Sequence, residues 1–318
     1  MTLQHSLGAD SAQQSRRQSR LSIDPARLRA QLPRQITAYL FLLPALITFA
    51  LFAWYPMLRS IQMSFQNVNL AGQSTWAGLD NFQLMLKDPA FEIAWRNSLE
   101  YVSWSLLLGF LLPVILAIFI REVRLGKGFF RVVYFLPTVV PAAVAVIIWR
   151  FLYDPDGGYL NAFLQQFGIA RQLWLSDPGL AKPALVTVMT WAGFGTTALI
   201  YLASLNDISS ELYEAAELDG ASPLRRIWHI SLPHLLPVMS LMFLLQIIAV
   251  VQVFTEPFLL TNGGPGRETL TPAMHIYNRA FIRLDVGYAS AWSVSMIVVL
   301  AIFSIIYRVV NARLNENS

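Results

Sequence analysis

Six long apolar stretches restrict what this sequence can fold into more than any other feature. Each is close to the roughly 20 residues that a helix needs to cross the hydrocarbon core of a bilayer. A segment in lipid must satisfy its own backbone hydrogen bonds, so each stretch is predicted to form a membrane-spanning helix. The stretches cover residues 36–56, 99–120, 129–151, 183–205, 235–254 and 289–309. The sequence therefore predicts an all-α integral membrane protein with six transmembrane helices.

Four prolines lie inside the first three stretches. Pro44 is in the first, Pro113 in the second, and Pro137 and Pro141 are in the third. Proline lacks the backbone donor that the helix interior uses, but membrane helices tolerate it with a local distortion. Kinks are therefore predicted in the first three spans.

The composition agrees with a membrane protein and excludes several other classes. Only 13% of the residues are charged and 55% are apolar, whereas soluble proteins are about one-quarter charged. The chain has no cysteine, which excludes disulfides, thiolate chemistry and cysteine-based zinc sites. Its arginines are spread over several loops instead of forming one basic face, so no nucleic-acid partner is expected.

Lysine and arginine are unevenly distributed between the two sides of the predicted helices. Cytoplasmic loops of membrane proteins carry an excess of these residues. Fourteen of the 23 lie in or beside the two terminal segments and the loops after the second and fourth spans, and nine lie in or beside the other loops. Both termini, and the loop between the fourth and fifth spans, are therefore predicted to be cytoplasmic.

The loop between the fourth and fifth spans, ELYEAAELDGASPLRRIWHISLPHLLP, is too polar to lie in lipid. Residues 211–218 are good helix formers, and Gly220 is the residue expected just past a helix end, where φ is positive. Ser222 and Pro223 are typical of an N-cap and the first residue of a second short helix. Pro233 is expected to end that helix before the chain enters the membrane again. The loop is therefore predicted to be a rigid helix–glycine–helix unit.

The same loop contains a longer pattern: Glu-Ala-Ala, three residues, Gly, nine residues and Ile-Ser-Leu-Pro. The pattern begins at Glu214, places its glycine at Gly220 and ends at Pro233. It resembles, position for position, the EAA loop of the membrane subunits of binding-protein-dependent ABC importers. The resemblance covers residues 36–310 and is closest to the first of the two membrane subunits of the maltose/oligosaccharide importers. The implied fold is that of a type I ABC importer permease, with six transmembrane helices and a cytoplasmic coupling loop.

The resemblance implies a multi-subunit assembly in the plasma (inner) membrane of a bacterium or archaeon. The chain would pair with a second, homologous permease subunit and contact two ATPase subunits. An extracytoplasmic solute-binding protein would deliver a sugar to the pair. ATP and Mg²⁺ would belong to the ATPase subunits, so no cofactor is expected on this chain. The residues implied in coupling to the ATPase are Leu212, Glu214, Ala215, Ala216, Asp219, Gly220, Ile230, Leu232 and Pro233.

These inferences divide the chain into three parts. Residues 1–35 form a cytoplasmic N-terminal tail, residues 36–310 form the permease domain, and residues 311–318 form a cytoplasmic C-terminal tail. The coupling loop, residues 207–234, joins the fourth and fifth spans.

The chain lacks the sequence features of an ATPase. Its one Gly-Lys pair, Gly126 with Lys127, has Arg121 where a phosphate-binding loop needs glycine, and Gly128 where it needs serine or threonine. ATP hydrolysis is therefore expected on a separate polypeptide, and no catalytic residue is proposed.

Charged residues are absent from the cores of the predicted spans. Glu100, Arg131, Arg150 and Glu256 lie at span ends, where a side chain can reach the interface. Ion-coupled carriers and proton pumps usually place ionisable groups in mid-membrane, so this class is disfavoured. His229 and His234 have the wrong spacing for ligands on one helix face, and no metal site is expected.

Uncharged polar and aromatic residues inside the spans are candidates for a solute pathway. A glutamine amide in an apolar span cannot satisfy all its donors and acceptors locally, which favours a role for Gln246 and Gln252. A threonine hydroxyl has the alternative of bonding to its own helix backbone. The resemblance, through the stretch from Leu136 to Pro141, adds positions on the helices that flank the loop. The candidate pathway residues are Thr138, Trp191, Gly193, Thr196, Gln246, Val250, Gln252 and Val253.

A loop after the fifth span contains two glycines and a proline, which predicts a tight, exposed turn. The stretch Leu-Thr-Asn-Gly-Gly-Pro is similar to one in the sugar-type importers. This similarity implies that Asn262, Gly263, Gly264 and Pro265 face the solute-binding protein.

The sequence thus predicts the permease subunit of an ATP-driven importer for an oligosaccharide or related polyol. Maltose itself is disfavoured, because Ala249, Val250 and Val253 replace aromatic and asparagine residues of the maltose subunit. One alternative is an importer of glycerol phosphates. An alternative from a different class is a self-sufficient channel or secondary carrier.

Overall fold

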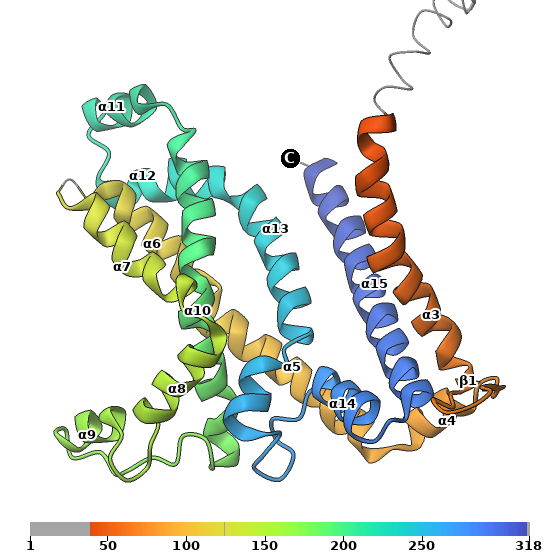
Figure 1. Ribbon diagram of the computed structural model, residues 1–318. Coiled ribbons are helices and arrows are strands. Elements are labelled where there is room, and N and C mark those ends of the chain that lie inside the picture. Colours follow the sequence, from red (N-terminus) through yellow and green to blue (C-terminus); the bar gives the residue numbers. More distant parts are fainter. Residues whose placement is uncertain (1–38, 124, 317–318) are drawn as a thin grey trace, which may run out of the picture. The chain divides into compact units, whose positions relative to one another are not determined.

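A computed structural model describes residues 39–123 and 125–316 (Figure 1). The chain divides between Arg59 and Ser60 into two compact units, which are taken separately below. The predicted N-terminal tail and the first three residues of the first predicted span lie outside the described residues.

The first unit contains the helix that begins at Tyr39, which continues to Ser64 and is a candidate membrane span. It includes a π-turn, η1 (Ala50–Trp54), and ends with α3 (Tyr55–Ser64). Pro44 lies within its regular α-helical part, so the distortion occurs six residues later than predicted. The Thr48 hydroxyl donates to the Pro44 carbonyl oxygen at 2.8 Å.

The second unit contains the remaining candidate spans. Five helices of the described residues, including the one that begins at Tyr39, are long and apolar enough to cross a membrane, and a bent pair makes a sixth if it counts as one span. This agrees with the predicted all-α membrane fold. The spans of the second unit are α5 (Pro89–Gly109) with α6 (Leu111–Glu122), the bent pair α7 (Lys127–Val139) and α8 (Ala142–Leu152), α10 (Pro178–Asn206), α12 (Pro223–Arg226) with η2 (Ile227–Ser231) and α13 (Leu232–Val251), and α15 (Val286–Glu316).

The bend between α7 and α8 is 100°, much larger than an ordinary kink. Pro141 cannot donate to the carbonyl of Pro137, and the Val140 N–H takes that carbonyl at 3.2 Å instead. Val140 then adopts the extended conformation that a following proline favours. The predicted kink is therefore a break in the span.

Pro113 also coincides with an interruption. Its ring would clash with the carbonyl of Gly109, four residues earlier, and α5 ends at Gly109. Helix α6 begins at Leu111, after Phe110, whose backbone remains helical, so α5 and α6 still form one span.

Short elements connect the spans of the second unit. Strands β1 (Gln66–Asn67) and β2 (Thr75–Trp76) form an antiparallel pair, which the all-α prediction did not include. The other short elements are α4 (Asp80–Lys87), α9 (Tyr159–Gln165), α11 (Ser210–Leu218), η3 (Pro257–Thr261), α14 (Pro272–Tyr277) and η4 (Asn278–Ile282).

Helix α10 lies at the centre of the packing and contacts α5, α6, α7, α8 and α13 (Figure 1). Two hydrophobic clusters lie along it. The first cluster surrounds Leu185 and includes Tyr101 of α5 and Val250 of α13. The second cluster surrounds Leu205 and includes Ile120 of α6 and Leu235 of α13. Helix α10 therefore joins the part of the fold near α9 to the part near α11.

Candidate functional site

The coupling loop begins with α11, which ends at the predicted glycine turn and begins at a serine cap that the sequence analysis did not select. Ser209 caps its N-terminus by accepting a hydrogen bond from the Glu211 N–H at 3.2 Å. At the other end Gly220 has φ +78°, and its N–H donates to the Glu217 carbonyl at 3.0 Å. The Ala221 N–H donates to the Ala216 carbonyl at 2.9 Å, which completes a Schellman motif. The predicted glycine turn is confirmed.

The second half of the loop begins as predicted but does not end as predicted. Ser222 caps α12 by accepting from the Arg225 N–H at 3.3 Å, and Pro223 is its first residue. The prediction that Pro233 ends this helix is wrong, because α12 continues through the π-turn η2 into α13. In the π-turn the Leu232 N–H pairs with the Ile227 carbonyl, five residues back. This wider turn accommodates a proline that would interrupt a regular α-helix.

Three side-chain contacts hold the loop together. Arg226 of α12 pairs with Glu217 of α11 at 3.0 Å, across the glycine turn. The Tyr213 hydroxyl hydrogen-bonds the Ser231 hydroxyl at 2.7 Å, which joins α11 to η2. The Arg121 guanidinium of α6 lies 4.3 Å from the centre of the Tyr213 ring. These contacts fix α11 to α12 and η2 within the loop and to α6 outside it.

The predicted coupling residues fall into two groups. Ala216, Ile230 and Leu232 are half-buried, and the latter two pack against the second cluster, beneath the loop. The other six side chains or backbones are exposed: Leu212, Glu214, Ala215, Asp219, Gly220 and Pro233.

The exposed face of the loop also contains apolar residues that the sequence analysis did not select. Leu224 is 64% exposed and Trp228 is 60% exposed, close in sequence to Leu218, which is 90% exposed. The sequence signal that could have identified them is the presence of large apolar side chains in a loop that is too polar for lipid. Their exposure indicates a surface that another protein or the membrane covers.

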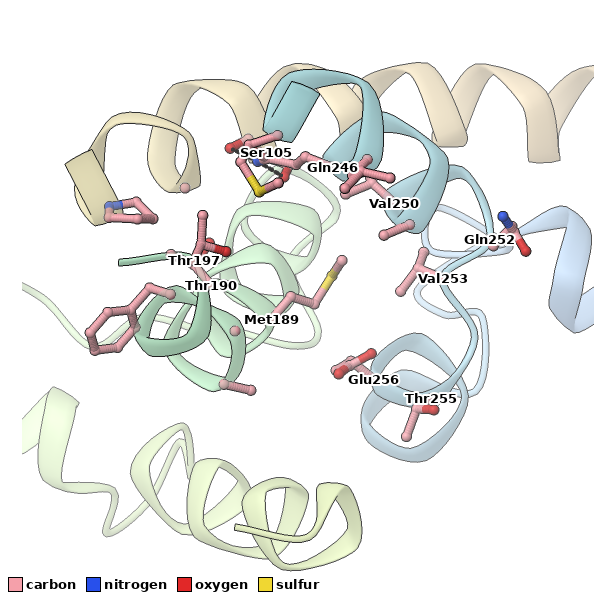
Figure 2. Close-up of a pocket in the computed structure, with 18 of the residues that line it drawn as sticks. Ser105, Met189, Thr190, Thr197, Gln246, Val250, Gln252, Val253, Thr255 and Glu256 are labelled. Carbon is pink, nitrogen blue, oxygen red and sulfur yellow. Dashed lines mark hydrogen bonds between the residues drawn. The ribbon is translucent and has the colours of Figure 1, made fainter. Parts of the chain in front are cut away.

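The central pocket, of about 670 Å³, lies between α5, α10, α13 and the turn after α13 (Figure 2). Its residues on α10 include Met189, Gly193 and Thr197, which recur every four residues and share one helix face. The predicted pathway residues that it brings together are Gly193, Gln246, Val250, Gln252 and Val253.

The two glutamines differ in their partners. The Gln246 amide donates to the Ser105 carbonyl at 2.9 Å and to the Ser105 hydroxyl at 2.7 Å, which links α13 to α5 at the wall of the pocket (Figure 2). As expected, it finds its partners outside its own helix. The Gln252 amide, just past the end of α13, instead donates to the Ile248 carbonyl at 3.2 Å, four residues back, and its side chain is exposed.

Three predicted pathway residues do not line the central pocket. The Thr138 hydroxyl donates to the Phe135 carbonyl at 2.7 Å, the local alternative open to a threonine. Trp191 packs against the first cluster, with its ring centre 5.9 Å from that of Trp149. Thr196 is exposed and is not among the lining residues.

The pocket also includes polar residues that the sequence analysis did not select as site residues, namely Ser105, Thr255 and Glu256. Thr190 also lines the pocket. It is three residues from Gly193, a spacing that places both residues on one helix face, whereas Trp191 is two residues away. Glu256 was expected to reach the membrane interface from a span end. The structure places it in the lining of the pocket, where burial raises the pKa of its carboxyl group.

The loop after η3 lines a second cavity of about 720 Å³, here called the loop cavity. Asn262, Gly263 and Gly264 line it, and Pro265 does not. Asn262 has φ 49° and Gly263 has φ +85°, which are the conformations of a tight turn.

Two buried side chains fix this loop to the membrane helices. The Asn97 amide of α5 donates to the Arg267 carbonyl at 2.8 Å and to the Leu270 carbonyl at 3.0 Å. The Lys182 side chain of α10 is 4% exposed and pairs with Glu268 at 2.8 Å and with Glu100 of α5. The hydrogen bond from Lys182 lowers the pKa of Glu268.

An ionic cluster lies beside the loop cavity. Asp88 accepts hydrogen bonds from the Arg279 guanidinium at 3.1 Å and from the Tyr288 hydroxyl at 2.8 Å. His275 stacks on Trp292, with ring centres 4.2 Å apart. Burial, helped by the charge of Arg279, lowers the pKa of His275 to about 4, so its imidazole is neutral at pH 7.

Comparison with known proteins places this geometry in a family. Residues 109–316 match the family model of the binding-protein-dependent transport system inner membrane component. The probable ABC transporter permease protein YurN of Bacillus subtilis (strain 168) is 35% identical over 274 residues, which cover 84% of this chain and 94% of that protein.

Two further relatives have names that state what they transport. The arabinooligosaccharides transport system permease protein AraP of Bacillus subtilis (strain 168) is 31% identical over 276 residues, 86% of this chain and 88% of that protein. The sn-glycerol-3-phosphate transport system permease protein UgpA of Agrobacterium fabrum is 31% identical over 291 residues, 89% of this chain and 97% of that protein.

The fold also matches solved structures. A chain of a bacterial ABC transporter involved in the import of the acidic polysaccharide alginate superimposes with a TM-score of 0.80 and 26% identity, covering 90% of this chain and 99% of that chain. A second structure of a bacterial alginate ABC transporter, in complex with an alginate pentasaccharide-bound periplasmic protein, matches with the same TM-score.

Proposed function

The chain belongs to the family of binding-protein-dependent transport system inner membrane components, and on that premise we propose that it forms half of the membrane pathway for a sugar. It is the permease subunit of an ABC importer, and the solute is an oligosaccharide or related polyol. The names of relatives such as AraP support a sugar, and the alternative of a self-sufficient channel or secondary carrier is not favoured.

One structural observation carries the proposal. Helices α10 and α13 both line the central pocket, and the same two helices flank the coupling loop. A displacement of the loop is therefore transmitted directly to two walls of the pocket. The exposed residues of α11, including Leu212 and Glu214, form the surface on which an ATPase subunit docks.

The proposed assembly contains this chain, a second homologous permease, two ATPase subunits that hold ATP and Mg²⁺, and an external solute-binding protein. The solved alginate transporter with its periplasmic protein supports the last partner. The chain resides in the inner membrane, with both termini and the coupling loop on the cytoplasmic side. Asn262, Gly263, Gly264 and Pro265 then face the solute-binding protein from the opposite side.

Uptake into proteoliposomes tests this function. The complete complex, with ATP on the side of the ATPase subunits, is expected to take up radiolabelled arabino-oligosaccharide or N,N′-diacetylchitobiose when the matching binding protein is supplied. Omitting ATP or the binding protein should abolish uptake. Solute uptake by this chain alone, without nucleotide, would show that it is a self-sufficient channel or carrier.

A further inference from the structure

Glu256 is the one charged side chain among the described residues that line the central pocket. It lies in the turn between α13 and η3, just before Pro257. Figure 2 shows its side chain extending from this turn toward the open space near Met189 of α10. The other polar residues of the pocket are uncharged serine, threonine and glutamine. Any fixed charge in the lining of this pocket therefore comes from the ionised Glu256 carboxylate.

Neither a helix cap nor an ion pair among the described residues engages the Glu256 carboxyl group. A carboxylate just before a helix commonly caps the first backbone N–H groups, but the Glu256 side chain makes no such bond to η3. Among the described residues no cation forms an ion pair with it, whereas Glu100 and Glu268 both pair with Lys182. Burial raises its pKa, a hydrogen bond from its own backbone N–H partly offsets this rise, and no neighbouring positive charge contributes. A carboxyl group has more acceptor sites than this one bond uses, so the remainder are available to whatever occupies the pocket.

An ionised carboxylate is only an acceptor of hydrogen bonds. It can accept from sugar hydroxyls and pair with an ammonium group, but it repels a phosphate or a carboxylate at close range. Resting on the function proposed above, we propose that Glu256 filters solutes by charge. Neutral sugars and amino sugars pass this wall of the pathway, and anionic solutes are disfavoured. The names of one relative and of one structural match include sn-glycerol 3-phosphate and alginate, which are both anions. The proposal predicts that this chain disfavours such solutes.

The absence of cysteine from the chain permits a direct test. Thr255, which also lines the pocket, is changed to cysteine in the complete transporter. Rates of modification are then measured with two thiosulfonate reagents of similar size, the cationic trimethylammonioethyl and the anionic sulfonatoethyl methanethiosulfonate. The mass of this chain reports the product. A change in the reactivity of the thiol affects both reagents alike, so the ratio of the two rates isolates the local charge.

We expect the cation-to-anion rate ratio to fall by about tenfold or more on Glu256→Gln, because one carboxylate acts in opposite senses on the two reagents. Glu256→Asp, which keeps the charge, should retain the high ratio and controls for misfolding. Glu92→Gln, which removes an exposed carboxylate of α5, should also leave the ratio unchanged.

The same ratio in the native and Glu256→Gln backgrounds, or a ratio that favours the anion while Glu256 is present, would overturn the charge filter. The measurement needs no transport. A loss of ATP-driven uptake with the ratio intact would therefore count against the proposed function and leave the charge assignment standing.

Discussion

Replacing Gly220 by valine isolates the geometry of the coupling loop from its contacts. The residue has φ +78°, and a Cβ built there would meet nothing within 4 Å. The first side-chain carbon therefore has open space around it. Its cost is that of a left-handed backbone at an L-residue, about 1–2 kcal/mol. That energy changes the population of the native turn by a factor of about 5–30.

The structure identifies what is lost when the turn relaxes. The two hydrogen bonds of the Schellman motif, from Gly220 and Ala221 to α11, depend on the positive φ. Without them α11 no longer has a fixed angle to α12, and closure of the ATPase subunits cannot be transmitted. The spans remain packed, because the clusters along α10 do not include Gly220.

The assay is ATP hydrolysis by the reconstituted complex with and without loaded binding protein. We expect Gly220→Val to reduce the stimulation by about 5–30-fold, the population factor above, while expression and assembly are maintained. Gly220→Asn is the matched control, because asparagine adopts the left-handed conformation more readily than other residues with a side chain, and it should retain most of the stimulation. Full stimulation in Gly220→Val would refute the reasoning.

Three further perturbations have defined outcomes. Glu214→Arg reverses a charge on the exposed face of α11 and should abolish stimulated ATPase activity, while binding-protein docking, measured by sedimentation, stays unchanged. Lys182→Met removes the buried cation that Glu100 and Glu268 share, which leaves Glu100 only its longer pair with Arg96, and should lower the free energy of unfolding by about 1–3 kcal/mol, seen as a lower thermal midpoint at pH 7. The pKa of Glu268 is lowered in the folded protein, so its stabilising contribution is present above its unfolded pKa and is lost as pH falls. The difference in stability between the native protein and Lys182→Met should therefore shrink in acid. The pKa of His275 in the folded protein is about 4, below the ordinary 6.5, so the unfolded state binds more protons than the folded state between these pH values. The free energy of unfolding should therefore fall by up to about 3 kcal/mol on acidification. His275→Phe should reduce this loss, as measured by thermal melts at several pH values.

Features set by neighbours in the sequence were predicted well. The glycine turn at Gly220 and the cap at Ser222 follow from backbone preferences that need no tertiary contact, and both are found. The break at Pro141 is correct in kind, but its 100° angle depends on how α7 and α8 pack against α10. The continuation of α12 past Pro233 was missed because a π-turn removes the conflict that the local rule assumes.

The pathway residues were predicted less completely, for a physical reason. A membrane helix that is apolar on all sides carries no periodic signal for the face that points to a cavity. Trp191 was selected by residue type and lies on another face of α10. The resemblance added Gly193, which lines the pocket, and Thr196, which does not. Glu256 was assigned to the interface because it follows a span, and the turn after α13 brings it into the pocket instead.

The central claim is that the coupling loop moves the walls of the central pocket. Labelling of Gln252→Cys with a membrane-impermeant thiol reagent tests it most directly, since this exposed side chain lines the pocket. In the complete transporter, a non-hydrolysable ATP analogue should change the labelling rate severalfold with Gly220 intact and should change it much less with Gly220→Val. An unchanged rate in the native background, or an undiminished nucleotide effect with Gly220→Val, would contradict the account.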